Sequence, residues 1–222
     1  MFSAITFYWG NDDNLHKYVK DTLQYTDDIV IGYIDLFGRV PEIEGAVIIP
    51  IKHDFLLKMG HSEVLNRLDI ACKYDWTFHA AVGKRITNFK YSMLDAPANI
   101  AGFASTEKDK GGAWSNLHHR NRATWFKTVH EVILPINGNY LSMEPIVEWE
   151  RTDYTYDSEE QERICKMYRQ MSRTKWVALE ETDPHPARST AIAKYNEHID
   201  AYSLNREDLI SYLLTHDLEA GM

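Results

Sequence analysis

The chain of 222 residues contains no apolar run close to the roughly 20 residues that a membrane-spanning helix needs. It opens on a strand-like segment with no basic region ahead of it, so no signal peptide is expected. It has only two cysteines, Cys72 and Cys165, both in helix-like segments, and we expect buried free thiols in a reducing compartment. These features predict a cytoplasmic protein without a membrane partner.

The sequence also lacks an excess of positive charge. Its 24 Lys and Arg residues stand against 33 Asp and Glu residues, giving a formal net charge of −9. Non-specific nucleic-acid binding depends on neutralising phosphates, so it is not expected here. Basic residues do cluster locally, at Lys84 and Arg85 and again at Arg120, Arg122 and Lys127. A local basic pocket therefore remains compatible with the overall charge.

Residues 1–81 alternate between strand and helix patterns. Residues 3–9, 28–35, 46–51 and 76–81 are apolar or β-branched runs, and apolar residues recur at helical spacing after Asp12 and through residues 62–74. Repeats of this kind predict a parallel sheet with right-handed crossovers. Their expected fold class is α/β.

The rest of the chain is less regular. Residues 96–112 carry Pro, Gly and charged residues and predict a loop, whereas residues 129–134 and 140–149 predict two strands around a tight Asn137-Gly138 turn. Beyond residue 153 a capping-box pattern and apolar stripes predict helices. We therefore expect a domain over residues 1–152 and a helical extension packed on it over residues 153–222.

Polar and aromatic residues follow the first two predicted strands. Trp9 and Asn11 come at the end of the first, and Asp35 closes the second. In α/β sheets, ligands bind outside the carboxyl ends of the strands, where Trp9 could stack on a base and Asp35 could accept a hydrogen bond from a ribose. The alternatives are that Trp9 belongs to the core and that Asp35 only forms a turn.

The densest group of reactive side chains lies in residues 117–135. Arg120 and Arg122 could clamp a diphosphate, or could line a solvated strand edge. His130 is an acid/base candidate and Glu131 lies beside it, on the opposite face if the segment is a strand. A structural histidine is the alternative for His130. A metal site that joins His130 to His118 and His119 is conceivable, but the spacing matches no zinc pattern.

Four segments together resemble the family 2 glycosyltransferases of the GT-A fold. They are AITFYWGNDDNLHKYVKDTLQYTDDIVIGYID, SEVLNRLDIACKYDWTFHAAVG, RNRATWFKTVHEVILPINGNYL and ALEETDPHPARSTAIAKY. The resemblance lies in their order and spacing, because each motif is loose. It implies a GT-A-like, mostly parallel mixed sheet flanked by helices, a nucleotide-sugar donor, and a C-terminal helical extension.

The sequence departs from the family where an acidic motif normally binds a divalent ion. The corresponding residues are Ala81-Val82-Gly83, followed by Lys84 and Arg85, so no carboxylate is present to hold Mg or Mn. Fixed cations could take over the neutralisation of the leaving diphosphate. The alternative is that Lys84 and Arg85 form an exposed turn.

The resemblance and this departure predict a metal-independent transferase that moves a sugar from a nucleoside diphosphate to an unknown acceptor. Trp9, Asn11 and Asp35 would hold the nucleoside. The diphosphate would bind Lys84, Arg85, Arg120 and Arg122. His130 or Glu131 would orient or deprotonate the acceptor hydroxyl, with Asp95 as a further base candidate.

Two other functions remain open from the sequence. The chain could be a catalytically silent nucleotide- or glycan-binding protein on the same scaffold, or a different α/β enzyme acting on a phosphorylated small molecule. The aromatic C-terminal segments could supply an interface, so a homo-oligomer is also compatible with the sequence.

Overall fold

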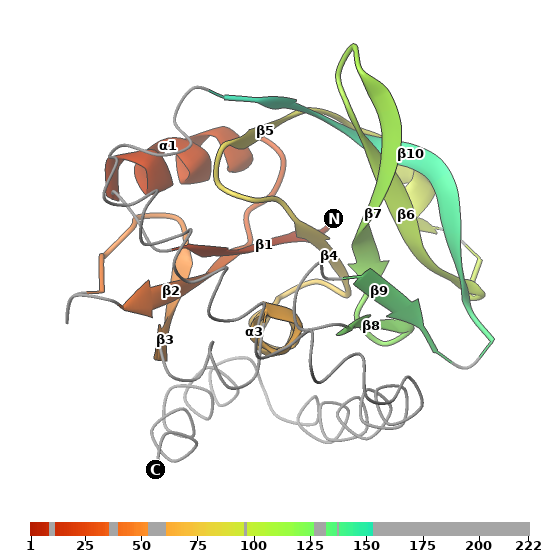
Figure 1. Cartoon of the computed structure of the whole chain (residues 1–222), viewed down its shortest axis with the longest axis horizontal. Coiled ribbons are helices and arrows are strands. Elements are labelled where there is room, and N and C mark those ends of the chain that lie inside the picture. The colour runs from red at the N-terminus through yellow and green to blue at the C-terminus, as the bar shows by residue number, and fades with distance from the viewer. Residues whose placement is uncertain are drawn as a thin grey trace, which may run out of the picture.

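The computed structural model of the chain describes residues 1–8, 12–35, 40–52, 61–95, 97–126, 132–136 and 138–152. They form an α/β fold in which a large mixed sheet carries one helix on each face (Figure 1). The predicted α/β class and mixed sheet are confirmed. The helical extension predicted for residues 153–222 lies outside the described residues. No helix in the described ranges is long and apolar enough to cross a membrane.

Two helices, ten strands and one 3-10 helix follow one another along the described residues. In chain order they are β1 (Ser3–Tyr8), α1 (Asp12–Thr22), β2 (Ile29–Asp35), β3 (Val47–Lys52), α3 (His61–Ala71), β4 (Trp76–His79), β5 (Lys84–Phe89), η1 (Tyr91–Asp95), β6 (Ile100–Glu107), β7 (Gly111–His119), β8 (Ala123–Phe126), β9 (Val132–Pro135) and β10 (Tyr140–Arg151).

The main sheet has eight strands in the order β3-β2-β1-β4-β7-β6-β10-β5, and β8 and β9 form a separate antiparallel pair. Strands β1 to β4 run parallel to their neighbours within the first half. The direction then reverses, because β7 pairs with β4 antiparallel. In the second half β6 runs parallel to β10 and antiparallel to β7, and β5 closes the sheet antiparallel to β10.

Successive side chains at the start of the chain pack into two separate cores. Phe2, just before β1, and Ala4 belong to the cluster that includes α1, whereas Ile5 belongs to the cluster that includes α3. All three are fully buried. Because successive side chains of a strand point to opposite faces, a strand covered on both sides is mostly apolar, as β1 and β2 are.

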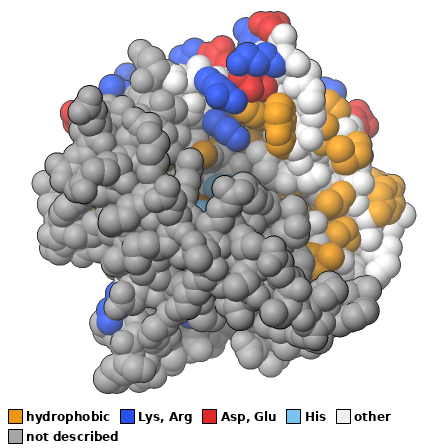
Figure 2. Space-filling view, in the orientation of Figure 1, with side chains coloured by type: hydrophobic (Ala, Val, Ile, Leu, Met, Phe, Trp, Pro, Cys, Tyr) orange, Lys and Arg blue, Asp and Glu red, His pale blue; other side chains and the backbone are white. Residues whose placement is uncertain are grey.

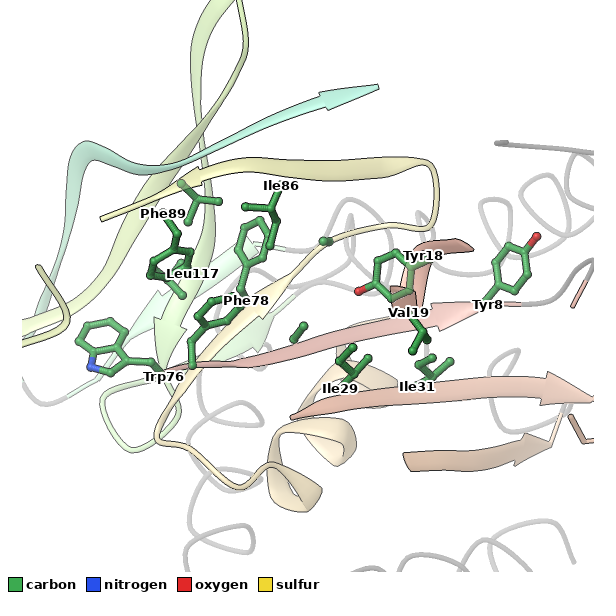
Figure 3. Close-up of a cluster of buried hydrophobic side chains, with 14 of the residues drawn as sticks. Tyr8, Tyr18, Val19, Ile29, Ile31, Trp76, Phe78, Ile86, Phe89 and Leu117 are labelled. Atoms are coloured by element: carbon green, nitrogen blue, oxygen red, sulfur yellow. The ribbon is translucent and has the colours of Figure 1, made fainter. Parts of the chain in front are cut away.

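Strand β5 covers the α1 face of the sheet and runs back across it (Figure 3). It begins at Lys84, beyond the end of β4, and reaches the start of β1, where the ring of Phe89 stacks on Phe2 with centroids 4.2 Å apart. Ile86 and Phe78 lie between them in the same core. The course of β5 therefore places its first residues near the carboxyl ends of the parallel strands.

On the opposite face, Asn66 of α3 fixes the β8–β9 pair to the sheet. The Asn66 amide donates to the Trp125 carbonyl over 3.1 Å and accepts from the Trp125 N–H over 2.9 Å. The Thr124 hydroxyl also donates to the Asn66 side-chain oxygen over 2.9 Å. A single helical side chain thus satisfies both backbone groups of a buried strand residue, which would otherwise lose their hydrogen bonds with water.

The two ends of the main sheet order are β3 and β5. Strand β3 pairs only with β2 among the described strands, and it contains Pro50, opposite Tyr33. Proline has no backbone N–H, so it is confined to edge strands and bulges. Its position in β3 agrees with that rule.

The strands and helices predicted within residues 1–81 are confirmed to within a few residues. Two predictions for the middle of the chain were wrong. Residues 96–112 are not one loop, because β6 and the start of β7 occupy much of this range. Residues 132–135 and 140–151 do not form a hairpin around Gly138, because β9 pairs with β8 while β10 pairs with β5 and β6.

Gly102 in β6 provides a test of how closely β6 packs against β7. A Cβ atom on Gly102 would lie 2.6 Å from the Leu117 carbonyl oxygen and 2.8 Å from a Leu141 methyl carbon. We expect Gly102→Ala to lower the free energy of unfolding by about 1–3 kcal/mol, measured by urea denaturation, because a backbone atom cannot move aside easily.

Gly111→Ala is the matched control for this substitution. Gly111 has a φ of +67° but no heavy atom within 4 Å of the added Cβ, so only the backbone conformation should cost free energy, about 1 kcal/mol. A Gly102→Ala protein as stable as the wild type would contradict the close approach of β6 and β7.

Candidate functional site

The parallel strands β1, β2, β3 and β4 end at Tyr8, Asp35, Lys52 and His79. We call this end of the sheet the carboxyl edge, and the end at which the same strands begin the amino edge. In open α/β sheets the loops at the carboxyl edge form the ligand crevice. The structure places the backbone of Asp35 at this edge, next to β1 and β3, as the sequence predicted.

Aromatic and imidazole rings gather at the carboxyl edge on the α3 face. The Phe7 ring lies 4.8 Å from the His61 ring and 5.8 Å from the His79 ring, measured between centroids. The Trp125 ring meets His79 edge-on at 5.5 Å. The Asn116 amide donates to the His79 carbonyl over 3.0 Å. His61 and His79 thus bring two titratable groups to the edge where ligands bind in this class of sheet.

Lys84 also lies at this edge, after the Ala81–Gly83 turn. Gly83 has a φ of +100°, and the Lys84 amine lies 4.2 Å from the centroid of the Trp149 ring. Burial lowers the pKa of Lys84, the charge of Arg151 lowers it further, and Glu107 acts in the opposite direction. No ion pair joins Lys84 to a carboxylate within the described ranges. The amine is therefore a partly desolvated cation, stabilised by a ring face.

Glu107 gathers two more cations beside Lys84. Its side chain is 6% exposed and forms ion pairs with Lys110 at 2.8 Å and with Arg151 at 3.2 Å. The ammonium of Lys110 and the guanidinium of Arg151 hold the pKa of Glu107 below its usual value. Three cations therefore surround one carboxylate, which leaves this end of the sheet locally positive.

The space-filling view agrees with this distribution. Figure 2 shows Lys and Arg side chains beside Asp and Glu near the top of the view, next to hydrophobic side chains. They stand above a hollow in which histidine is visible.

Arg85, the neighbour of Lys84, does not share its environment. Its guanidinium pairs with Glu150 on the adjacent strand β10, and both side chains are at least partly exposed. The residue points to the other side of β5, because successive strand residues alternate. Lys84 and Arg85 begin a strand rather than an exposed turn.

Arg120 and Arg122 lie at the amino edge, far along β4 from Lys84. The Arg120 N–H donates to the Asp75 carbonyl, and its guanidinium pairs with the Asp75 carboxylate at 3.1 Å and donates to the Cys72 carbonyl over 2.6 Å. Arg122 donates to the Ile100 carbonyl over 3.0 Å. The structure therefore does not bring these arginines together with Lys84 and Arg85 into one group of cations.

Asp95 belongs to the same amino-edge neighbourhood. It ends η1, and the preceding Leu94 accepts a hydrogen bond from the Trp76 indole over 3.0 Å. The guanidinium of Arg122 lies 5.9 Å from the centroid of the Trp76 ring. Asp95 and Arg122 thus both lie close to Trp76, at the opposite edge from Lys84.

Four of the predicted site residues lie outside the described residues. They are Trp9, Asn11, His130 and Glu131. Their predicted roles, and the opposite faces predicted for His130 and Glu131, stay predictions. The side chain of Asp35 is likewise not described.

His118 is a buried structural group. Its Nε2 lies 2.8 Å from the Asp69 carboxylate, and its Nδ1 lies 3.2 Å from the Thr77 hydroxyl. His118 is fully buried and Asp69 is 3% exposed.

No group of three potential metal ligands occurs within the described ranges. Cys72, which lies within the described ranges, is a free and buried cysteine. Its burial raises the pKa of the thiol.

Sequence reasoning missed His61, His79, Glu107, Trp114 and Arg151 as site candidates. The signal for His79 was available, because it ends a predicted strand at the edge where ligands bind. Glu107 and Arg151 gave no local signal, since they meet Lys84 only through the pairing of β5, β6 and β10.

In comparisons with known proteins, no protein-family model matched this chain and no curated protein matched it. The functional argument therefore depends on the residues and their geometry.

His119 provides a pH-dependent test at the amino edge. Its pKa is lowered from 6.5 to about 4, first by burial and then by Arg122. Because the folded state binds this proton less tightly, stability present above pH 6.5 is lost as the pH falls towards 4, by at most about 1.4 kcal/mol per pH unit. We expect His119→Gln to reduce this dependence of the free energy of unfolding on pH, measured by urea denaturation between pH 4 and 6.5.

Exposed His16 supplies the control, as His16→Gln. It should leave the pH dependence of the unfolding free energy as it is in the wild type. Equal pH profiles for His119→Gln and the wild type would show that His119 does not carry the effect.

Proposed function

We propose that this chain is a glycosyltransferase-like protein with a GT-A-like donor site. It binds a nucleoside-diphosphate sugar at the carboxyl edge and transfers the sugar without a metal ion. The observation that carries the proposal is the position of Lys84. It follows the turn at which the resembled family has its acidic motif, and its amine is partly desolvated with no carboxylate pairing to it among the described residues.

The residues around Lys84 support diphosphate binding. Lys84 and Arg151 place two positive charges near Glu107. Lys110 also pairs with Glu107 and so balances the negative charge of that carboxylate. A cation held in a low-dielectric site stabilises developing negative charge more strongly than a solvated one. A leaving diphosphate develops such charge when its bond to the sugar breaks.

In the proposed reaction, an acceptor hydroxyl oxygen forms a bond to the anomeric carbon, and the bond from that carbon to the diphosphate oxygen breaks. The nucleoside diphosphate leaves with the bonding electron pair. The hydroxyl proton passes to a general base, for which His130 and Glu131 are the candidates from the sequence, because Asp95 lies at the amino edge, away from Lys84. Trp9, Asn11 and Asp35 are proposed to hold the nucleoside.

The position of Arg120 and Arg122 reduces the set of cations that we propose as diphosphate ligands. The carboxyl ends of parallel strands are the ligand-binding ends, and these arginines lie at the amino edge. Arg120 also donates to the carbonyls of Asp69 and Cys72 at the end of α3. We therefore propose Lys84, with Arg151, as the principal diphosphate ligands, and keep Arg120 and Arg122 as the alternative that the experiment below separates.

Lys84→Met tests the donor site. Methionine keeps an apolar stem against Trp149 and removes the charge. We expect the wild type to be stabilised thermally by UDP- or GDP-sugars in the presence of EDTA, and Lys84→Met to bind them at least roughly tenfold more weakly, a loss of about 1.4 kcal/mol. Without ligand, the variant should be no less stable, because the lowered pKa shows that the charged lysine costs stability below its usual pKa of 10.5.

Two controls complete the measurement. Arg85→Gln removes the adjacent cation, which already pairs with Glu150, and should leave the nucleotide-induced shift unchanged. Arg120→Ala should lower stability while the shift persists. If Arg120→Ala abolishes the shift and Lys84→Met does not, the diphosphate lies at the amino edge. No shift with any nucleotide sugar would overturn the proposal.

The missing acidic motif favours a second candidate, a catalytically silent binding protein on the same scaffold. Ala81-Val82-Gly83 offers no carboxylate at that position. Such a protein would show the same Lys84-dependent shift, but no release of nucleoside diphosphate with any acceptor. A coupled assay for nucleoside diphosphate release distinguishes the two.

A further inference from the structure

Trp114 is an exposed aromatic side chain held in a fixed position. It lies on β7 and is 44% exposed, the largest exposed aromatic ring in the described residues. Its ring packs against Trp149 with centroids 5.5 Å apart at an interplanar angle of 56°. A tryptophan held against a second aromatic ring, with part of its surface open to solvent, can pack on the apolar face of a ligand.

Two contacts hold this pair of tryptophans. The Trp149 indole donates to the Ser105 hydroxyl over 3.1 Å, and Trp149 is 2% exposed. Gly112 has a φ of +84°, and a Cβ atom there would lie 3.0 Å from the Trp114 ring. Glycine therefore lets the ring lie directly against the backbone. We call Trp114 together with Trp149 the aromatic platform.

The aromatic platform lies beside the proposed donor site. Pairing of β7 with β4 sets Leu117 opposite Phe78, so Trp114 projects beyond the end of β4 at the carboxyl edge. Lys84 contacts the same Trp149 ring that Trp114 contacts. A molecule resting on Trp114 would thus be near the phosphates proposed to bind Lys84.

Polar groups surround the platform. Gly111, three residues before Trp114 in β7, pairs with Glu107 of β6. Glu107 carries its ion pairs to Lys110 and Arg151, whose side chains are 63% and 70% exposed. An aromatic face flanked by carboxylate, ammonium and guanidinium groups matches a ring with an apolar face and hydrogen-bonding edges.

We propose that the aromatic platform binds a pyranose ring of the acceptor. A sugar presents C–H groups of partial positive charge on one face, which suit the negative face of tryptophan, and hydroxyls around its rim. Glu107, Lys110 and Arg151 beside the platform offer acceptors and donors for those hydroxyls. The assignment of this sugar as the acceptor rests on the proposed transferase function, whereas glycan binding at Trp114 does not.

The test is binding of the full chain to an array of immobilised oligosaccharides that end in different hexoses and N-acetylhexosamines. We expect the wild type to bind a subset. Trp114→Ala should weaken that binding at least roughly tenfold, and Trp114→Phe should retain part of it. Gly112→Ala, which displaces the ring, should weaken binding as well. Tyr140→Ala is the matched control, because Tyr140 is 48% exposed but lies at the opposite end of β10 from Trp149.

The outcomes separate this inference from the proposed function. All variants should keep the nucleotide-sugar thermal shift. If that shift is absent but glycan binding depends on Trp114, the glycan site stands and the transferase proposal fails. The platform proposal is overturned if no saccharide binds, or if Trp114→Ala and Tyr140→Ala bind alike. It is also overturned if Trp114→Ala removes the nucleotide shift, or if the chain prefers single-stranded RNA at physiological salt.

Discussion

The buried contact of His118 with Asp69 and Thr77 is the interaction on which the arrangement of the sheet depends. It joins three elements at once, because Asp69 is on α3, Thr77 on β4 and His118 on β7. A buried imidazole needs hydrogen-bond partners, and here the antiparallel pairing of β7 with β4 supplies Thr77 while α3 supplies Asp69. The same pairing reverses the strand direction and so divides the sheet into a parallel and a mixed half.

That division decides which candidate residues can act together. The parallel half provides the carboxyl edge, where His61 and His79 lie, and β5 returns Lys84 to it. The mixed half extends past that edge and contributes Glu107, Trp114 and Arg151. A cationic group and an aromatic surface thereby come to one side of the molecule. The arginines that follow β7 lie on the other side, where Arg120 donates to the backbone at the end of α3 and Arg122 to the Ile100 carbonyl.

The sequence predicted the parallel half well and the mixed half poorly, for physical reasons. Each parallel strand is a short apolar run with a helix or a turn after it, and both signals are local. Residues 100–119 contain several glycines and a charged turn, which locally favour a loop, and their strand character depends on pairing with distant segments. The Asn137-Gly138 signal was also local, and long-range pairing of β10 with β6 overrode it. In the candidate site, Lys84 could be proposed from its place in the chain alone. Its partners Trp149 and Arg151 could not, because they meet it only across the sheet.

The proline in β3 has a consequence for self-association. An edge strand with a full row of free N–H and C=O groups can recruit the same strand of another copy and extend the sheet between molecules. Pro50 lacks one donor, so any continuous ladder built on β3 would have a gap in its middle. A homo-oligomer of this protein is therefore not expected to extend the sheet from one copy to the next through β3.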